Sequence, residues 1–466
     1  MKKYDLLVIG VGPAGMAVAA MGTAMGLKVL AIESHKVGGE CLNYGCIPSK
    51  ALLKAGEACK NACTLQDFGL NLTEKPSIND PLQIVRDKIN DISGPKTMKM
   101  FDKVDFVLQK GNAKFVNKKI IEVDGKTYTA KHIFIGTGTE PFIPPIPGIK
   151  DIDELTNLNM FEQKSIPKSL LIIGGGAIGS EMAQAFTRLG SQVTIVQIDK
   201  HLMPQGDEDA GLELQKAFEK EGIKVLNNTK IEKAEKTESG VKLYTSAGIL
   251  EADKLLVAAG RKPAIASLEL DNAKIKYNKK GIIVNDNMQT NIKNVYAIGD
   301  CNGLSLFSHA AMHQGMIALM NAINPLPFKM KNSKFVVPWS VFTKPEVAQV
   351  GLTEKEAIQK GLKFQIIKEY YENYGRTIAD GKPEGFVKVI TDSRGKIYGA
   401  TIVGEAASEM IHEWALAIQK NIKLFDIMML QHSFPTISLM NKRIAESWMM
   451  NKMKNKFIQK LIKFFI

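Results

Sequence analysis

The chain has 466 residues, enough for two to four domains, and its 45% hydrophobic content is typical of a globular protein. Its net charge is +13, but the lysines are scattered and no aromatic and basic module accompanies them, which argues against nucleic-acid binding. Five cysteines suit a reducing compartment, and no segment is long and apolar enough to span a bilayer, so we expect a cytoplasmic protein.

The first element is an apolar run at Asp5–Ile9, which predicts a buried parallel strand. Gly10, Gly12 and Gly15 follow with the spacing GxGxxG, and then a predicted helix and a second strand that ends in Glu33. Such glycines let a pyrophosphate approach the backbone, the helix N-terminus supplies N–H groups, and the acid binds ribose hydroxyls. All parts stand at the required spacing, so the segment predicts a dinucleotide site.

The next stretch, GGECLNYGCIPSK at 38–50, contains two cysteines, Cys41 and Cys46. Pro48 and the helix formers after it predict a helix that starts near Cys46, where the positive end of the helix dipole favours a thiolate and lowers the pKa of the thiol. We expect Cys41 to lie on the preceding loop, free to meet a partner. The pattern indicates a redox pair; a purely structural disulfide is the alternative, with little use in a chain that lacks a secretory context.

This motif resembles the redox-active motif of the class I pyridine nucleotide–disulfide oxidoreductases, the family of dihydrolipoyl dehydrogenase, glutathione reductase and mercuric reductase. The resemblance extends to about Trp448 and implies that the first fingerprint holds FAD. It also implies that Cys46 is the thiolate next to the flavin and Cys41 the outward thiol that exchanges with substrate. Within the motif, Glu40 stands where these enzymes usually carry Thr and adds a negative charge beside the cysteines.

After a predicted helix near 84–100, short strands are expected at 119–123, 126–130 and 132–135, with Asp-Gly at 124–125 as a hairpin turn. The resemblance then implies three further contacts with the flavin nucleotide. Gly138 belongs to a loop like the family's second flavin-contacting loop. Gly260 lies where the chain returns to the flavin domain, and Asp300 matches the acid that contacts the ribityl chain.

A second fingerprint begins with a strand at 170–173, continues through Gly174, Gly176 and Gly179, and leads into a predicted helix at 181–189. Two fingerprints in one chain predict two nucleotides, which the resemblance identifies as FAD and a nicotinamide cofactor.

The strand after this helix, at 192–198, decides between NADH and NADPH only weakly. Gln197 stands where an NAD-selective site would carry an acid, and Asp199 follows two residues later. No Arg that could bind a 2′-phosphate comes directly after the strand, so we expect NADH to be preferred over NADPH.

The resemblance also assigns a role to Glu181. In the family, a Glu on this helix pairs with the Lys of the redox helix, here Lys50, beside the flavin. A cation there can stabilise negative charge on the reduced cofactor. The aromatic residue that often covers the nicotinamide pocket is replaced by Ala177.

From about residue 335 the pattern changes to antiparallel strands, expected at 339–342, 364–368, 385–391 and 398–403, with helices at 408–420 and 437–450. The segment 342–354 resembles the start of the family's dimerisation domain. We therefore expect a homodimer.

The resemblance breaks at the segment that supplies a catalytic His-Pro-Thr and Glu in dihydrolipoyl dehydrogenase and glutathione reductase. Here Phe434 occupies the His position and Leu439 the Glu position. His432 lies two residues earlier, and a structural role for it is favoured over an acid–base role. Acid–base help of this kind contributes roughly 10²–10⁴ in rate, so exchange with lipoamide or glutathione disulfide should be slow.

The last segment, 451–466, carries five lysines and no acids. On a helix, its apolar residues share one face: Phe457, Ile458, Leu461, Ile462 and Phe465. A basic amphipathic helix of this kind can lie on an anionic membrane surface, or its apolar face can pack on the partner subunit.

Together these features predict an α/β fold with two Rossmann-like domains: an FAD domain at 1–148 and 268–330, and an NAD(P) domain at 149–267. A C-terminal α+β dimerisation domain at 335–450 and the tail follow. The expected path runs from NAD(P)H through FAD to the disulfide and on to an undefined acceptor, as in mercuric-reductase-like members, and no metal site is predicted. The alternatives are a dihydrolipoyl dehydrogenase, an electron-transfer or metal-reducing flavoprotein whose cysteines are secondary, and a redox-sensing protein at the membrane surface with low turnover.

Overall fold

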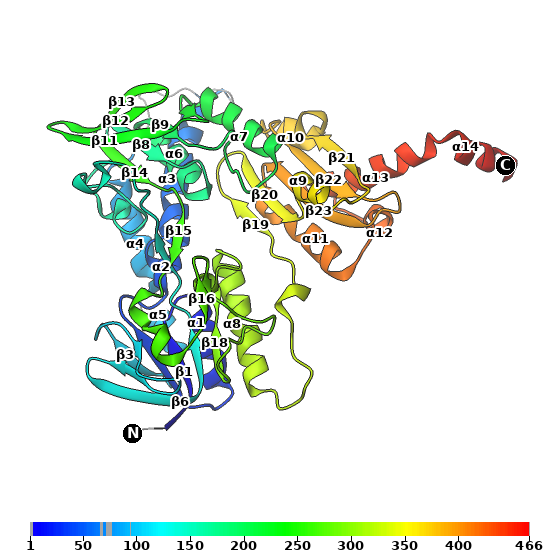
Figure 1. Cartoon of the computed structure of the whole chain (residues 1–466). Helices are drawn as coiled ribbons and strands as arrows, with labels where there is room; N and C mark the ends of the chain where they lie inside the picture. Colours follow the sequence, from blue (N-terminus) through cyan, green and yellow to red (C-terminus); the bar gives the residue numbers. More distant parts are fainter. Residues whose placement is uncertain (1–2, 66–68, 71–76, 94, 466) are drawn as a thin grey trace.

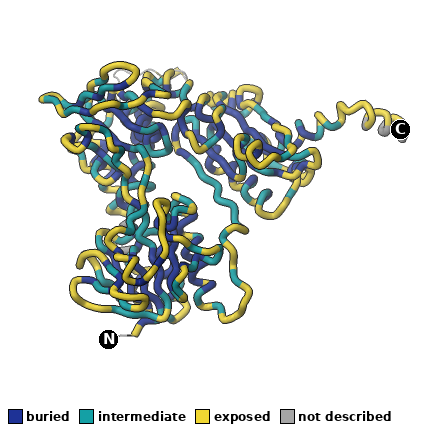
Figure 2. The backbone as a smooth tube through the Cα atoms, in the orientation of Figure 1, coloured by how far each residue is buried: buried dark blue, intermediate teal, exposed yellow. Residues whose placement is uncertain are grey.

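The computed structural model describes residues 3–65, 69–70, 77–93 and 95–465. Figure 1 shows three lobes, with the N-terminal strands in the lower lobe and a helix that carries the C-terminus away from the body. In Figure 2 each lobe has its own buried interior. The mixed α/β composition agrees with the predicted fold class.

The lower lobe is built on a seven-stranded sheet in the order β3-β2-β1-β6-β5-β4, with β18 paired to β6. Its strands are β1 (Lys3–Ile9), β2 (Val29–Glu33), β3 (Asp105–Leu108), β4 (Lys114–Phe115), β5 (Ile121–Val123), β6 (Lys126–Ile135) and β18 (Val295–Ala297). The apolar run of β1 is buried on both faces, because Leu6 and Val8 belong to one core and Leu7 and Ile9 to another. This explains why the strand does not alternate polar and apolar residues.

Helices α1 (Pro13–Ala24) and α8 (Ser308–Ile323) pack on each other against one face of this sheet. The turn expected at Asp124-Gly125 is present between β5 and β6, which pair antiparallel. The two strands expected at 126–130 and 132–135 are one continuous strand, β6, since its first half pairs with β5 and its second half with β1 and β18. The helix expected at 84–100 is divided into α4 (Pro81–Ser93) and α5 (Pro95–Lys99), and a proline begins each helix.

The upper left lobe has a parallel sheet in the order β10-β9-β8-β14 and a three-stranded antiparallel sheet, β11-β12-β13. Its elements are β8 (Ser169–Ile173), α6 (Ala177–Arg188), β9 (Gln192–Val196), α7 (Glu208–Lys220), β10 (Lys224–Leu226), β11 (Ile231–Thr237), β12 (Gly240–Thr245), β13 (Gly248–Ala252) and β14 (Lys254–Val257). Helix α6 begins four residues before the predicted start, directly after the last glycine that precedes it, Gly176.

A long helix, α3 (Cys46–Thr64), connects these two lobes. It begins at the redox motif, and its body packs on α6. Leu52 and Leu53 belong to the same core as Met182 and Phe186 of α6. Gly56 allows a close approach at this contact, because a Cβ atom there would lie only 3.2 Å from the carbonyl oxygen of Ala185. The redox helix is therefore part of the interior of the second nucleotide lobe.

The two lobes are also joined by a two-stranded antiparallel sheet of β7 (Thr139–Pro141) and β15 (Arg261–Pro263). The short strands β16 (Tyr277–Asn278) and β17 (Gly281–Ile282) follow in the lower lobe.

The upper right lobe is a five-stranded antiparallel sheet in the order β19-β20-β23-β22-β21. Its elements are β19 (Trp339–Val341), β20 (Glu346–Gly351), α9 (Glu354–Gln359), β21 (Gln365–Tyr370), α10 (Gly375–Ala379), β22 (Phe386–Thr391), β23 (Ile397–Gly404), α11 (Ala407–Lys420), α12 (Leu424–Met429) and α13 (Leu439–Met453). The strands and helices expected from residue 339 onward all appear, and β20, α9, α10 and α12 are present in addition.

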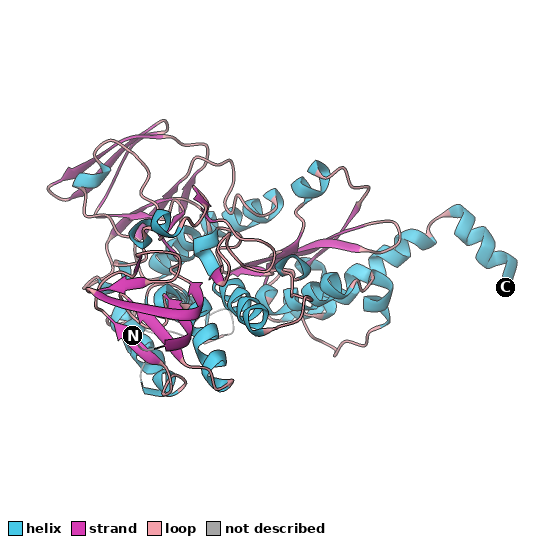
Figure 3. Ribbon diagram, turned by 60° about the horizontal axis from the view of Figure 1, so that its bottom comes forward, coloured by secondary structure: helices cyan, strands magenta, loops and turns pink. Residues whose placement is uncertain are grey.

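The tail forms α14 (Lys456–Phe465), which points away from the body in both views of the ribbon (Figures 1 and 3). Phe457 is 73% exposed. The side chains of Ile458, Leu461, Ile462 and Phe465 lie outside what the structure describes, so the choice between membrane and partner subunit stays a prediction. Within the described part of the chain, no helix is both long and apolar enough to cross a membrane.

Candidate active site

The first fingerprint forms an open cradle between β1 and α1. Gly10 has φ +88°, and a Cβ atom on Gly15 would lie 2.0 Å from the carbonyl oxygen of Gly10, so side chains are excluded at both positions. At Gly12 the nearest atom to such a Cβ would be 3.9 Å away, so that side of the loop is open. Backbone approach and a free helix N-terminus are what a pyrophosphate requires, and the loop fits the diphosphate of FAD.

Glu33 ends β2 and is buried next to this loop. Its carboxylate accepts hydrogen bonds from the backbone N–H groups of Val11 (2.7 Å) and His35 (2.8 Å). These bonds fix the carboxylate beside the fingerprint, and each oxygen retains a lone pair for a ribose hydroxyl.

The two cysteines of the redox motif lie on two consecutive helices, Cys41 on a short one and Cys46 on a long one. Cys46 is the first residue of α3, as predicted. Cys41 is not on a loop but in a short helix, α2 (Gly39–Asn43), because Gly38 and Gly39 adopt positive φ angles that turn the chain into this helix. Both cysteines are free thiols and partly buried.

The surroundings of the two thiols make them chemically different. A hydrogen bond from Cys41 lowers the pKa of Cys46 to about 6, and a hydrogen bond from Ser308 and the charge of Lys50 act in the same direction against burial. The Ser308 oxygen lies 3.2 Å from the Cys46 sulfur. The pKa of Cys41 is raised, first by the same hydrogen bond and then by burial. Cys46 is therefore the thiolate of the pair and Cys41 the protonated thiol.

Lys50 and Glu181 form the ion pair that the resemblance implied. The Lys50 ammonium donates to both carboxylate oxygens of Glu181 at 2.8 and 2.9 Å. Glu181 is buried, so it needs this cation close by. Because Lys50 lies one helical turn after Cys46 on α3, its charge also reaches the thiolate.

The second fingerprint repeats the geometry of the first. Gly174 has φ +107°, and a Cβ atom on Gly179 would lie 1.9 Å from the carbonyl oxygen of Gly174. At Gly176, where α6 starts, no atom lies within 4 Å of such a Cβ, so the approach to the helix N-terminus is open. The loop fits the diphosphate of a second nucleotide.

At the end of β9 the predicted and the observed polar groups differ. Asp199, the acid singled out from the sequence, is exposed. Gln197 is 4% exposed and donates to Asn227 at 2.7 Å, while its side-chain oxygen has no hydrogen-bond partner and points to the fingerprint at Gly175. A buried acceptor without a partner retains the capacity to accept one hydrogen bond. Position 197 was already of interest from the sequence, since it is where an NAD-selective site would carry the ribose acid.

A polar network that was not foreseen joins the redox motif to the β7–β15 sheet. Glu40 forms an ion pair with Arg261, and Arg261 donates through Nε to the Thr139 hydroxyl at 2.6 Å. The Thr139 hydroxyl is 3.5 Å from the carboxylate of Asp300, and Asn157 donates to Glu40 at 3.3 Å. Burial raises the pKa of Glu40 and raises that of Asp300 to about 6, whereas the charge of Arg261 lowers both.

Gly138 and Gly260, the two glycines expected near the flavin, lie beside this network. Gly138 and Gly260 have φ +69° and +126°, and at neither would a Cβ atom meet another atom within 4 Å. Both backbones are thus open to a ligand, as the FAD site requires.

The C-terminal segment places an exposed aromatic ring where related enzymes carry an acid–base His. Phe434 is 80% exposed and joined to Pro435 by a cis peptide bond. His432 is bound by Glu413, whose carboxylate oxygens lie 3.1 and 3.3 Å from Nε2, and only 7% of the His432 side chain is exposed. Glu413 in turn accepts from Asn441 at 2.8 Å. These contacts hold the segment on α11 and α13.

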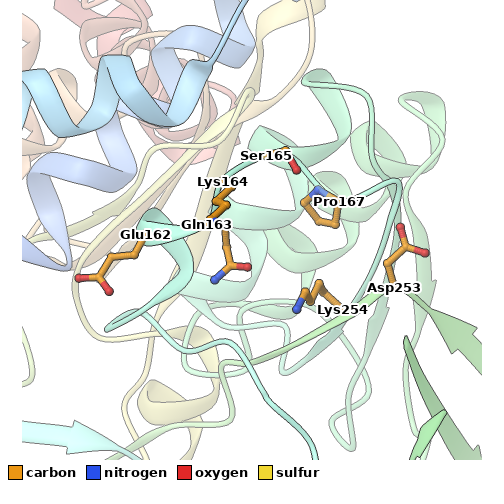
Figure 4. Close-up of a pocket in the computed structure, with 7 residues that line it drawn as sticks. All are labelled: Glu162, Gln163, Lys164, Ser165, Pro167, Asp253 and Lys254. Atoms are coloured by element: carbon orange, nitrogen blue, oxygen red, sulfur yellow. The ribbon is translucent and has the colours of Figure 1, made fainter. Parts of the chain in front are cut away.

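Two further observations concern pockets and metal ligands outside the predicted site. The hollow in Figure 4 is lined by Glu162, Gln163, Lys164, Ser165, Pro167, Asp253 and Lys254, none of which belongs to the predicted site. No group of three or more His, Cys, Asp or Glu side chains suited to a metal ion occurs in the part of the chain that the structure describes.

Comparisons with known proteins identify the family of the chain. A family model described as pyridine nucleotide-disulphide oxidoreductase matches residues 4–315, and the model of that family's dimerisation domain matches 337–443. The dihydrolipoyl dehydrogenase of Thermus scotoductus is 39% identical over 454 residues, which covers 94% of this chain and 96% of the relative. The mercuric reductase of Lysinibacillus sphaericus is 36% identical and covers 91% of this chain and 79% of the relative.

Solved structures with the same fold include the HOCl-induced flavoprotein disulfide reductase RclA from Escherichia coli. It superposes with a TM-score of 0.85 at 26% identity and covers 96% of this chain and 100% of that chain. A Cu(II) complex of the same reductase gives a TM-score of 0.86 over the same shares.

Proposed function

Because the chain belongs to the pyridine nucleotide–disulphide oxidoreductase family, an FAD-dependent family of enzymes that use NAD(P)H, we propose that its dithiol passes electrons to a thiophilic metal ion. The observation that carries this proposal is the exposed Phe434 at the acid–base position. Its dimerisation domain supports a homodimer.

The fingerprint at Gly10–Gly15 and Glu33 would hold the adenosine part of FAD, and Gly138, Gly260 and Asp300 would lie along its flavin part. The fingerprint at Gly174–Gly179 would hold the nicotinamide cofactor. When bound, FAD accepts a hydride from that cofactor and supplies two electrons to the Cys41–Cys46 disulfide.

The preference for NADH remains part of the proposal. Gln197 offers an unpaired buried acceptor, which suits a 2′-hydroxyl and would repel a 2′-phosphate. Asp199 is exposed nearby and adds negative charge. Both features favour NADH.

The two thiols have separate proposed roles. Cys46 enters as the thiolate, stabilised by Cys41, Ser308 and Lys50. Cys41, in the outer position, would bind the acceptor. Oxidation of the dithiol to the disulfide releases two electrons and the thiol proton, and two electrons reduce one Hg(II) to Hg(0) or two Cu(II) to two Cu(I).

The chemistry of the acceptor explains why Phe434 is compatible with turnover. Exchange with a disulfide substrate produces a departing thiolate that must be protonated, and the reverse reaction needs a base for the attacking thiol. A metal ion bound to thiolates is reduced without a proton donor. His432 is bound by Glu413 and does not offer a free ring nitrogen at Nε2.

The experiment compares acceptors for the FAD-loaded homodimer. Anaerobic titration with NADH, followed by visible absorbance, should show a long-wavelength thiolate-to-flavin band, and Cys46→Ser should abolish it. NADH oxidation should then be supported by Hg(II) or Cu(II) and should fall in Cys41→Ser. Rapid turnover of wild-type protein with dihydrolipoamide would contradict the proposal.

That contrary result would favour the second candidate, a dihydrolipoyl dehydrogenase with an unusual base. The 39% identity to the Thermus scotoductus enzyme over nearly the whole chain supports this candidate. A protein that binds at the membrane surface with low turnover is a third reading, supported by the basic helix α14 alone. Deletion of 451–466 tests it, because liposome co-sedimentation should be lost only if the tail binds lipid.

A further inference from the structure

The hairpin of β19 and β20, the first of the dimerisation domain, is hydrogen-bonded to α6, the helix that packs on the redox helix α3. The backbone N–H of Phe342 donates to Glu181 at 3.0 Å. One turn along α6, the Gln184 side chain accepts from the backbone N–H of Lys344 at 2.7 Å and donates to its carbonyl at 2.6 Å. Three hydrogen bonds thus fix the register of the segment between β19 and β20 along α6.

This register places the aromatic ring of Phe342 against Lys50. The Lys50 ammonium lies 4.4 Å from the centre of the ring, within the range of a cation–π contact. On its other side it is bound to both oxygens of Glu181. Phe342 therefore contacts both members of the pair, the anion through its backbone and the cation through its ring.

Packing alone does not account for this ring. Its neighbours Val341 and Thr343 are fully buried, whereas Phe342 is 37% exposed. Val341 belongs to a hydrophobic core and Phe342 to none among the described residues. The contact that distinguishes the ring is the one with the ammonium.

We propose that Phe342 is a positioning residue, supplied by the dimerisation domain, that holds the Lys50 ammonium over the first turn of α3 so that its charge acts on Cys46. Lys50 is 37% exposed, so without the ring its long side chain could turn to solvent and its charge would be screened. The inference concerns the reactive thiol and does not depend on which acceptor the enzyme uses.

The test measures the acidity of Cys46 instead of turnover. The FAD-loaded homodimer is reduced anaerobically with NADH, and iodoacetamide alkylation of the Cys46 peptide is followed by mass spectrometry from pH 4.5 to 9. Phe342→Leu keeps the backbone N–H and removes the aromatic face, whereas Phe342→Tyr keeps both. Phe328→Leu is the matched control, since Phe328 is 82% exposed on another loop. Phe342→Met replaces the Leu variant if the latter does not fold.

We expect Phe342→Leu to raise the alkylation midpoint by about 0.3–0.7 pH unit, the scale of one partly exposed cation–π contact. Lys50→Met should raise it further, by about one unit, because it removes the charge itself. Phe342→Tyr and Phe328→Leu should match wild type. The proposal is overturned if Phe342→Leu has the wild-type midpoint, if Phe342→Tyr shifts as much as Phe342→Leu, or if Lys50→Met has no effect.

Discussion

The ion pair between Glu40 and Arg261 gives the sharpest stability prediction, because it is absent from the family motif and lies inside the site. The change is Arg261→Met, which removes the guanidinium and leaves an apolar side chain of similar length. Glu40 then loses its ion pair, and Thr139 loses a donor. The Arg261 side chain is 15% exposed and that of Glu40 is 32% exposed.

Removing one partner of a fully buried pair costs about 3–5 kcal/mol, and the partial exposure of Glu40 lowers our expectation to about 2–3 kcal/mol. The double variant Glu40→Thr/Arg261→Met removes both members of the ion pair and restores the residue that the family usually carries. Asp300 loses the nearby charge of Arg261 in the single and the double variant alike, so this loss cancels when the two variants are compared. The double variant should recover about 1–2 kcal/mol of the loss, a coupling that a double-mutant cycle measures.

The pH dependence of the stability of the Arg261→Met variant provides an independent check of this prediction. Burial raises the pKa of Glu40 and Arg261 lowers it, so the pKa in the Arg261→Met variant should rise further above the unfolded value. A carboxyl group whose pKa is raised in the folded state loses stability as the pH rises from the unfolded pKa towards the folded pKa. The variant should therefore lose stability relative to wild type as the pH rises above the ordinary glutamate pKa of about 4.3.

The assay is urea unfolding of the FAD-loaded protein at several pH values, with flavin fluorescence and circular dichroism as separate probes, since a multidomain chain need not unfold in one step. Equal stability of the single and double variants would refute the reasoning. A cost of Arg261→Met that is the same at pH 5 and pH 8 would refute it as well.

Four other predictions concern single sites. Lys388 is 2% exposed between Asp207 and Asp209, so Lys388→Met should cost about 3–5 kcal/mol in urea unfolding, and a loss below about 1 kcal/mol would contradict this. Asp199→Ala should reduce the ratio of kcat/KM for NADH to that for NADPH; an unchanged ratio would remove the role given to this acid. Phe434→His should increase lipoamide turnover at least about tenfold, part of the usual contribution of acid–base catalysis, and no increase would show that position 434 is not what limits it. In reduced wild-type protein, alkylation of Cys46 should decline as the pH falls through about 6, while a midpoint near 9 would contradict the thiolate assignment.

The sequence predicted the features that depend on local spacing. These features follow from patterns within about 30 residues. They are both fingerprints, the helix that starts at Cys46 and the expected strands of the C-terminal lobe, and all are present. The Lys50–Glu181 contact spans 131 residues and was reached only through the family resemblance.

The features that were missed depend on packing between distant segments. Glu40 and Arg261 are 221 residues apart, and nothing in the sequence near either one indicates the other. The contact of Phe342 with Lys50 likewise requires the register between β19 and α6. Cys41 was placed on a loop because a five-residue helix is too short to show a hydrophobic period.

The long helix α3 has a consequence for how the molecule can move. Its first residue is a reactive cysteine, and Leu52 and Leu53 are locked into the interior of the lobe that carries the second fingerprint. Because an α-helix resists stretching and bending, that lobe cannot swing relative to the dithiol without breaking close-packed contacts. The separation between the second fingerprint and the sulfur pair is thus fixed by this helix. We expect access to the dithiol from that side to be controlled by individual side chains and not by movement of the lobe that carries the second fingerprint.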